Sequence, residues 1–194
     1  MKYTLTVFCC LAVLASSGCQ KKSDTSHLQQ TSGAVAAAGA AKNVSALIAV
    51  ESRADKKVPL FSWTDENGKK ITIDEFAQGG GVLVNFWATW CGPCRKEIPD
   101  LVSLDGEYKS QGVKILGISV DRDGDVMATV SEFVNGNAIK YPIVVDNGEL
   151  EKAFGGIRGI PTTFFVDKNG MITKRMIGLQ SRATFAQAMD AIKP

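Results

Sequence analysis

The sequence predicts an α/β sandwich of three layers, with a central mixed sheet, helices on both faces and a β-hairpin at the N-terminal side of the domain. Three observations support this prediction. From Val58 onward, apolar runs of strand length alternate with longer helical segments. The runs 82–87 and 113–120 are almost continuously apolar, as in strands that are covered on both faces. The chain then closes with a hairpin and a helix, which completes the pattern of a layered α/β domain.

The expected elements occupy residues 58–194, a length sufficient for one such core. In chain order, the expected strands are 61–64, 70–73, 82–87, 113–120, 141–145, 162–166 and 171–177, and the expected helices are 91–110, 126–135, 149–154 and 181–192. The first two strands flank residues 65–68, an Asp-Glu-Asn-Gly stretch that is typical of a hairpin turn.

The remaining boundaries follow from residues that start, bend or turn the chain. The long helix is expected to begin at Cys91, directly after the first buried strand, and Pro99 is expected to bend it. Asn169-Gly170 is the tight turn of the C-terminal hairpin. Ser181 is expected to cap the last helix, because a serine hydroxyl accepts a free N–H of the first turn.

Composition excludes several classes of function. The 194 residues carry 22 Lys and Arg against 20 Asp and Glu, so the formal charge is +2 and there is no basic stripe for a nucleic-acid partner. An apolar content of 45% is typical of a packed core. His27 is the only histidine, and we expect no metal and no bound cofactor. Nothing in the sequence indicates an oligomer, so a monomer is expected.

The N-terminus is expected to direct export. Residues 1–18 have one positive charge, a short apolar run and small residues, as in a secretory signal peptide. The stretch Ala15-Ser16-Ser17-Gly18-Cys19 resembles a bacterial lipoprotein signal, which implies cleavage before Cys19 and a lipid on its thiol, hence attachment to a membrane. The alternative is ordinary cleavage that leaves Cys19 as a free thiol. Residues 19–57 are expected to be the lipidated N-terminus and a flexible tether, within which 43–53 fits a short helix.

The chemistry is expected at Trp90-Cys91-Gly92-Pro93-Cys94, where a buried strand leads into a helix. Cys91 falls at the helix N-terminus, where unpaired amides and the helix dipole favour an anion and lower the thiol pKa. Cys94 lies about one turn further on and can reach the sulfur of Cys91. Gly92 and Pro93 are expected to permit and stiffen the turn. One sulfur can attack a substrate disulfide and the other can resolve the mixed disulfide.

Three other interpretations of the cysteine pair are weaker. A zinc half-site needs two more Cys or His ligands, which residues 58–194 lack. Haem attachment needs a histidine after the second cysteine, and Arg95 stands there. A purely structural disulfide over so short a loop would constrain little of the unfolded chain.

At these residues the chain resembles a family. The stretch from Val82 to Pro99 resembles the membrane-tethered thioredoxin-like reductases of bacteria, of the TlpA and ResA type, and the cytochrome c maturation thioredoxins. The stretch from Gly159 to Asp167 is similar to the cis-proline loop of that family. The resemblance covers residues 58–194 and implies a thioredoxin-like fold, with Pro161 cis and facing the cysteine pair. It also implies that the backbone of Ile160 pairs with the extended chain of a substrate.

The resemblance leaves the proton-transfer group open. Thioredoxins carry a buried acid on the strand before the motif, but Asn85 stands there and cannot accept the proton of Cys94. Asp121 is the candidate for proton transfer; the alternative interpretation is that Asp121 is a solvated carboxylate of a loop. Glu97 matches a glutamate common in the family; the alternative interpretation is that Glu97 is an exposed carboxylate of the helix. Trp90 is expected to cover the sulfurs.

The favoured function is a thiol–disulfide oxidoreductase that works outside the cytoplasm. Gly-Pro between the cysteines is the dipeptide found in reducing thioredoxins, whose reduction potential is about −270 mV. This dipeptide favours a reductase, and its expected substrates are disulfides in exported proteins such as apocytochrome c. The resemblance implies a transmembrane thiol reductant as electron donor. A thiol peroxidase is one alternative, but Ala88 and Val84 replace the Thr or Ser and the Pro that precede its reactive cysteine. A lipoprotein binding module with a vestigial cysteine pair is the other.

Overall fold

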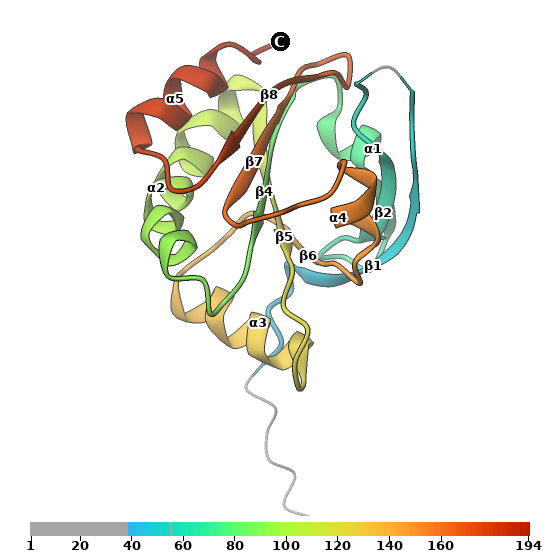
Figure 1. Cartoon of the computed structure of the whole chain (residues 1–194), viewed down its shortest axis with the longest axis vertical. Helices are drawn as coiled ribbons and strands as arrows, with labels where there is room; N and C mark the ends of the chain where they lie inside the picture. The colour runs from blue at the N-terminus through green and yellow to red at the C-terminus, as the bar shows by residue number, and fades with distance from the viewer. Residues whose placement is uncertain (1–38, 55) are drawn as a thin grey trace, which may run out of the picture. The chain divides into compact units, whose positions relative to one another are not determined.

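The computed structural model describes residues 39–54 and 56–194 (Figure 1). The expected signal peptide, Cys19 and the first half of the expected tether lie outside the described residues. The strands are β1 (Val44–Glu51), β2 (Leu60–Thr64), β3 (Lys70–Thr72), β4 (Gly81–Trp87), β5 (Val113–Ser119), β6 (Ile143–Val145), β7 (Thr162–Val166) and β8 (Ile172–Ile177). The helices are α1 (Ile73–Ala77), α2 (Gly92–Tyr108), α3 (Val126–Gly136), α4 (Glu149–Ala153) and α5 (Arg182–Asp190), with a 3-10 turn η1 (Lys109–Gln111) after α2.

The strands form one mixed sheet in the order β3-β2-β1-β6-β5-β4-β7-β8. β4 pairs with β5 in parallel and with β7 in antiparallel orientation, and each of its residues is buried. Its last two side chains point to opposite faces: Trp87 packs on Phe133 of α3 at 5.2 Å between ring centroids, and Phe86 packs on Phe154 beyond α4 at 5.0 Å. Figure 1 shows α2 and α5 on one side of the sheet and α4 on the other. The predicted α/β sandwich is confirmed.

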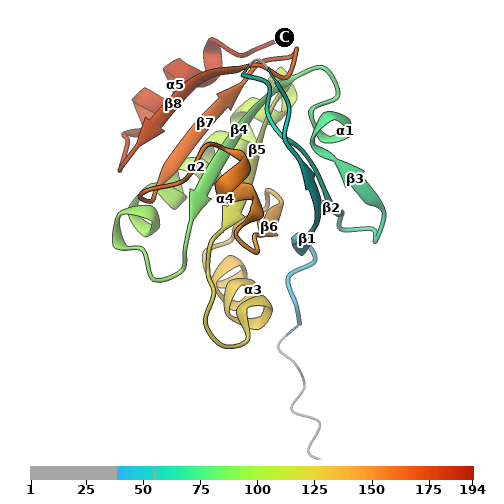
Figure 2. The same cartoon turned by 45° about the vertical axis from the view of Figure 1, so that its right-hand side comes forward.

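The sequence prediction was wrong for residues 44–51, which form β1 rather than a helix or flexible tether. β1 pairs antiparallel with β2 and parallel with β6, and so joins the two halves of the sheet (Figure 2). Leu47 and Val50 pack against the core. The alanines and leucine of this stretch favour helix, but its valines and isoleucine favour strand, and pairing with two neighbouring strands decides the outcome.

A second difference lies at the expected strand 70–73, which ends at Thr72. Ile73 instead begins α1, because Thr72 and Glu75 form a capping box. The Thr72 hydroxyl accepts the Glu75 N–H at 3.2 Å, and the Glu75 carboxylate accepts the Thr72 N–H at 2.8 Å. Pro99 lies inside α2 without ending it, and Ser181 caps α5 as predicted.

The topology brings separate segments together at one edge of the sheet. β4, β5 and β6 run parallel, so their carboxyl ends lie at the same edge. β4 leads there into Cys91, and β5 leads into Asp121. β7, antiparallel to β4, begins at this edge directly after Pro161. The cysteine pair, Asp121 and the proline loop are therefore neighbours although they are distant in sequence.

Candidate active site

Cys91 and Cys94 stand at the start of α2 and are joined by a disulfide. Cys91 is the N-cap residue, in extended conformation, and its Sγ accepts the backbone N–H of Cys94 at 3.2 Å. Cys91 is 4% exposed, whereas Cys94 is 0% exposed. After reduction, a thiolate on Cys91 would lie at the positive end of the helix dipole beside a free N–H, which stabilises it.

Gly92 and Pro93 occupy the first positions of the helix. Pro93 fits there because its missing N–H would have had no partner in the first turn. A Cβ at Gly92 would meet no atom within 4 Å, and the φ of Gly92 is outside the left-handed region. The backbone therefore does not require glycine at this position, contrary to the sequence-based expectation. Gly92 instead leaves the surface beside Cys91 free of a side chain.

The proline loop lies against the outer cysteine. The Ile160–Pro161 peptide bond is cis, the geometry that the resemblance implied. The carbonyl oxygen of Ile160 lies 3.8 Å from the Sγ of Cys91. The carbonyl of Pro161 accepts the N–H of Gly178 at 2.8 Å, so the end of β8 holds the loop from behind. The proline loop is thus bound at Gly178 and lies beside the disulfide at the carbonyl of Ile160.

A buried polar cluster links β4, α2 and β7. Glu97 is 1% exposed, so it is not the exposed helix carboxylate that was the alternative. The amide of Asn85 donates to Glu97 at 2.9 Å and to the hydroxyl of Thr163 at 3.0 Å. The N–H of Gln180 donates to the other carboxylate oxygen of Glu97 at 3.4 Å. Asn85 thus occupies the place of a buried acid and binds a carboxylate supplied by the helix.

The surroundings of Glu97 change its acidity. Burial raises the pKa of Glu97 from 4.5 to about 7, although the hydrogen bonds from Asn85 and Gln180 act in the opposite direction. Glu97 therefore gains and loses its proton close to neutral pH. It lies three residues after Cys94 on the same helix, so the two side chains share one face of α2.

Asp121 is also buried, at 4% exposure, so it is not a solvated loop carboxylate. It follows β5 and receives hydrogen bonds from the hydroxyl of Thr89 at 2.6 Å and from the hydroxyl of Ser119 at 2.8 Å. The N–H of Thr89 also points at this carboxylate, at 3.1 Å. Thr89 belongs to the turn that precedes Cys91, so Asp121 is tied by hydrogen bonds to the turn that leads into Cys91.

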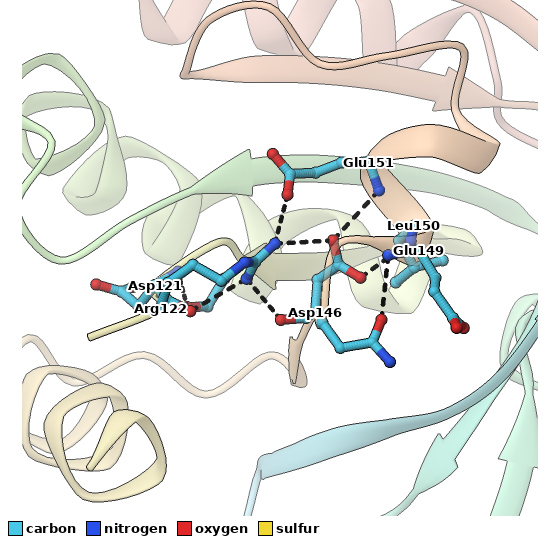
Figure 3. A network of polar contacts seen from close by, with 8 residues as sticks. Asp121, Arg122, Asp146, Glu149, Leu150 and Glu151 are labelled. Carbon is cyan, nitrogen blue, oxygen red and sulfur yellow. Dashed lines mark hydrogen bonds and ion pairs between the residues drawn. The ribbon is translucent and has the colours of Figure 1, made fainter. Parts of the chain in front are cut away.

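The residue after Asp121 is held by ionic contacts (Figure 3). The guanidinium of Arg122 donates to the carbonyl of Asp146 at 2.6 Å and pairs with the Asp146 carboxylate at 3.3 Å. It also pairs with Glu151 of α4. Asp146 in turn accepts the N–H of Leu150 at 2.9 Å at the start of α4. The loop after β5 is therefore fixed between the cysteine turn and α4.

Three large apolar side chains are exposed next to the cysteine turn or next to Gly178. Trp90 directly precedes Cys91 and is 68% exposed, whereas Trp63 and Trp87 are buried in the core. Ile177 and Leu179 are exposed on either side of Gly178, whose N–H binds the proline loop. Exposed apolar side chains therefore stand next to Cys91 in the sequence and next to the residue that binds the proline loop.

Three further residues, which sequence reasoning did not single out, contact the two buried carboxylates or the amide of Asn85. These residues are Thr89, Thr163 and Gln180. Thr89 could have been found, because it and Asp121 each stand two residues after the end of adjacent parallel strands. Gln180 contributes only a backbone N–H, which any residue except proline supplies, so no sequence signal marks it.

In residues 39–54 and 56–194, no group of three or more His, Cys, Asp or Glu side chains could hold a metal ion. No helix in these same ranges is long and apolar enough to cross a membrane.

The fold and the cysteine pair define a class of enzyme, the thiol–disulfide oxidoreductases. The profile of the AhpC/TSA family matches residues 54–175, and the chain belongs to this family. A thiol-disulfide oxidoreductase ResA of Bacillus anthracis is 37% identical over 139 residues, which cover 72% of this chain and 78% of that protein.

Solved structures agree with this assignment. A thiol:disulfide interchange protein of the thioredoxin family from Chlorobium tepidum TLS has a TM-score of 0.64 and 33% identity, over 73% of this chain and 98% of its own. The pneumococcal exposed lipoprotein thioredoxin Etrx1 from Streptococcus pneumoniae has a TM-score of 0.57 and 25% identity, over 68% and 98%. The predicted thioredoxin-like fold and thiol–disulfide oxidoreductase activity are thereby confirmed.

Proposed function

We propose that the protein reduces disulfides in exported proteins outside the cytoplasm, through the dithiol of Cys91 and Cys94. The arrangement of the two sulfurs is the observation that supports this most. Cys91 is slightly exposed and accepts a helix N–H, so it is suited to attack, whereas Cys94 is fully buried and suited to resolve. The Gly-Pro pair between them favours a reductant.

The proposed reaction consists of two thiol–disulfide exchange steps. The thiolate of Cys91 attacks one sulfur of the substrate disulfide, forms a mixed disulfide and displaces a substrate thiolate, which takes up a proton. Cys94 then loses its proton and attacks the sulfur of Cys91. This step breaks the mixed disulfide, releases the second substrate thiol and leaves the Cys91–Cys94 disulfide. A transmembrane thiol reductant supplies the two electrons that restore the dithiol.

We assign to Glu97 the role of accepting the proton that Cys94 loses before it attacks. Asn85 cannot accept a proton, and the hydrogen bonds of Asp121 go to Thr89 and Ser119. Glu97 shares a helix face with Cys94, and its pKa of about 7 allows proton exchange at neutral pH. This replaces the sequence-based assignment of Asp121.

The substrate chain is expected to bind along the proline loop. An extended segment can pair with the backbone of Ile160, which lies next to the sulfur of Cys91. The exposed side chains of Trp90, Ile177 and Leu179 would contact apolar residues on either side of the substrate cysteine. Apocytochrome c before haem attachment is the specific substrate that we propose to test.

The location follows from the N-terminal sequence. The lipoprotein-like stretch before Cys19 supports a lipid anchor, and one similar solved structure is itself described as an exposed lipoprotein thioredoxin. We therefore assign the protein to the outer face of a membrane in the cell envelope, as a monomer on a tether.

Trapping in the native host tests this proposal. Cys94→Ala removes the resolving sulfur, so mixed disulfides should accumulate through Cys91 and yield exported proteins by mass spectrometry. The double variant Cys91→Ala/Cys94→Ala is the control and should trap nothing. Adding Cys19→Ser should move the trapped complexes out of the membrane fraction. Capture of cytoplasmic proteins alone, or equal capture by the double variant, would contradict the proposal.

A further inference from the structure

Thr89 lies in the middle of the turn that carries Cys91. The N–H of Cys91 donates to the carbonyl of Ala88 at 3.1 Å, which closes the turn across Thr89 and Trp90. The position of this turn decides whether Cys91 stays at the N-cap of α2, where its Sγ accepts the N–H of Cys94. A group that holds Thr89 therefore acts on the environment of the reactive sulfur.

The carboxylate of Asp121 is that group. Its Oδ1 accepts the Thr89 hydroxyl at 2.6 Å, and its Oδ2 accepts the Ser119 hydroxyl at 2.8 Å. The N–H of Thr89 approaches both oxygens, at 3.3 and 3.1 Å. Within the described ranges, no hydrogen bond of this carboxylate goes to Cys91, Cys94 or Glu97.

The carboxylate is itself rigidly placed. The N–H of Val120 donates to the carbonyl of Trp87 at 2.9 Å, which continues the pairing of β5 with β4 up to Asp121. On the other side, Arg122 donates to the carbonyl of Asp121 at 3.1 Å while it binds Asp146. Asp121 is therefore fixed by backbone contacts before its side chain meets Thr89.

We propose that Asp121 is a positioning residue, which acts on Cys91 by holding Thr89 and thereby the turn at the start of α2. The carboxylate supplies strong, charge-assisted hydrogen bonds to the Thr89 hydroxyl and N–H. Loss of this clamp would let Cys91 leave the N-cap geometry, so its thiolate would be less stabilised and less often aligned with a substrate disulfide. The inference concerns the established thiol–disulfide activity and does not depend on location or substrate.

A pair of substitutions at Thr89 separates this role from a general loss of structure. Thr89→Val keeps the shape of the side chain and the charge of Asp121 but removes the hydroxyl. It should lower the rate of insulin disulfide reduction by about tenfold and raise the pH midpoint for alkylation of Cys91. Thr89→Ser keeps the hydroxyl and should retain a rate and a midpoint close to those of the wild type.

A control for stability is available in another part of the domain. Asn43 donates to the carbonyls of Ile139 and Tyr141 at 3.2 and 2.8 Å, so Asn43→Ala also removes two polar contacts. This variant should lower the melting temperature without changing the rate or the alkylation midpoint. Urea titration of every variant identifies any that does not fold, and the alkylation midpoint reports on Cys91 independently of substrate.

A double-mutant cycle tests whether Asp121 acts through Thr89. Asp121→Asn should lower the rate of insulin disulfide reduction. The double variant Asp121→Asn/Thr89→Val should be no slower than the slower of the two single variants, because both changes break the same contact. The inference is overturned if Thr89→Val keeps the wild-type rate and midpoint. It is also overturned if the two losses multiply, which would assign Asp121 an independent role such as proton transfer.

Discussion

Replacing Cys91 by serine is expected to reduce the rate of insulin disulfide reduction to the background rate of the dithiothreitol in the assay. A serine hydroxyl is not ionised at neutral pH and cannot form a disulfide, so neither the mixed disulfide nor the final disulfide can form. Cys94 cannot replace Cys91 as attacker because its side chain is fully buried under the helix start.

The matched variant Cys94→Ser should behave differently. Cys91 keeps its place at the helix N-terminus and should still attack, so one equivalent of mixed disulfide should form without turnover. Turnover is measured as insulin reduction, and the mixed disulfide as a mass shift on a non-reducing gel. Activity of Cys91→Ser equal to that of the wild type would refute the assignment of the attacking sulfur.

Replacing Glu97 by glutamine is expected to change how stability depends on pH. Burial raises the pKa of Glu97 from 4.5 to about 7, so the folded protein keeps a proton that the unfolded chain releases. The stability associated with this proton is fully present below pH 4.5 and is lost as the pH rises through about 7. A shift of this size corresponds to a free energy of up to about 3 kcal/mol.

Urea unfolding of the wild type and of Glu97→Gln at pH 4, 6 and 8 measures this difference. The wild type should lose stability between pH 4 and pH 8 relative to the variant, because glutamine does not ionise. Glu107→Gln is a suitable control, since Glu107 is exposed on the same helix and its pKa is lowered by Arg182. Parallel pH curves for the wild type and Glu97→Gln would contradict this account, because they would show that the pKa of Glu97 is the same in the folded and unfolded states.

The sequence predicted those parts of the molecule that depend on local pattern. The buried strands gave nearly continuous apolar runs, and the cysteine pair stood at a strand–helix junction, as β4 and α2 show. Pro161 was placed by its resemblance to a known loop. These features were readable because each is encoded within a few adjacent residues.

The parts that the sequence did not predict depend on contacts between distant segments. β1 has little strand pattern of its own and is formed by pairing with β2 and β6. The cluster around Glu97 joins Asn85 to Thr163, which lies 78 residues further along the chain. Whether Glu97 was exposed or buried could be settled only once α2, β7 and the segment at Gln180 were packed together.

The most direct test of the central claim is to identify which sulfur of the reduced protein reacts first. The fully reduced wild type is treated at pH 7 with less than one equivalent of iodoacetamide, and the labelled peptides are identified by mass spectrometry. Because Cys91 lies at the helix N-terminus and Cys94 is buried, the label should be found on Cys91 almost alone. Equal labelling of the two cysteines, or preferential labelling of Cys94, would contradict the mechanism.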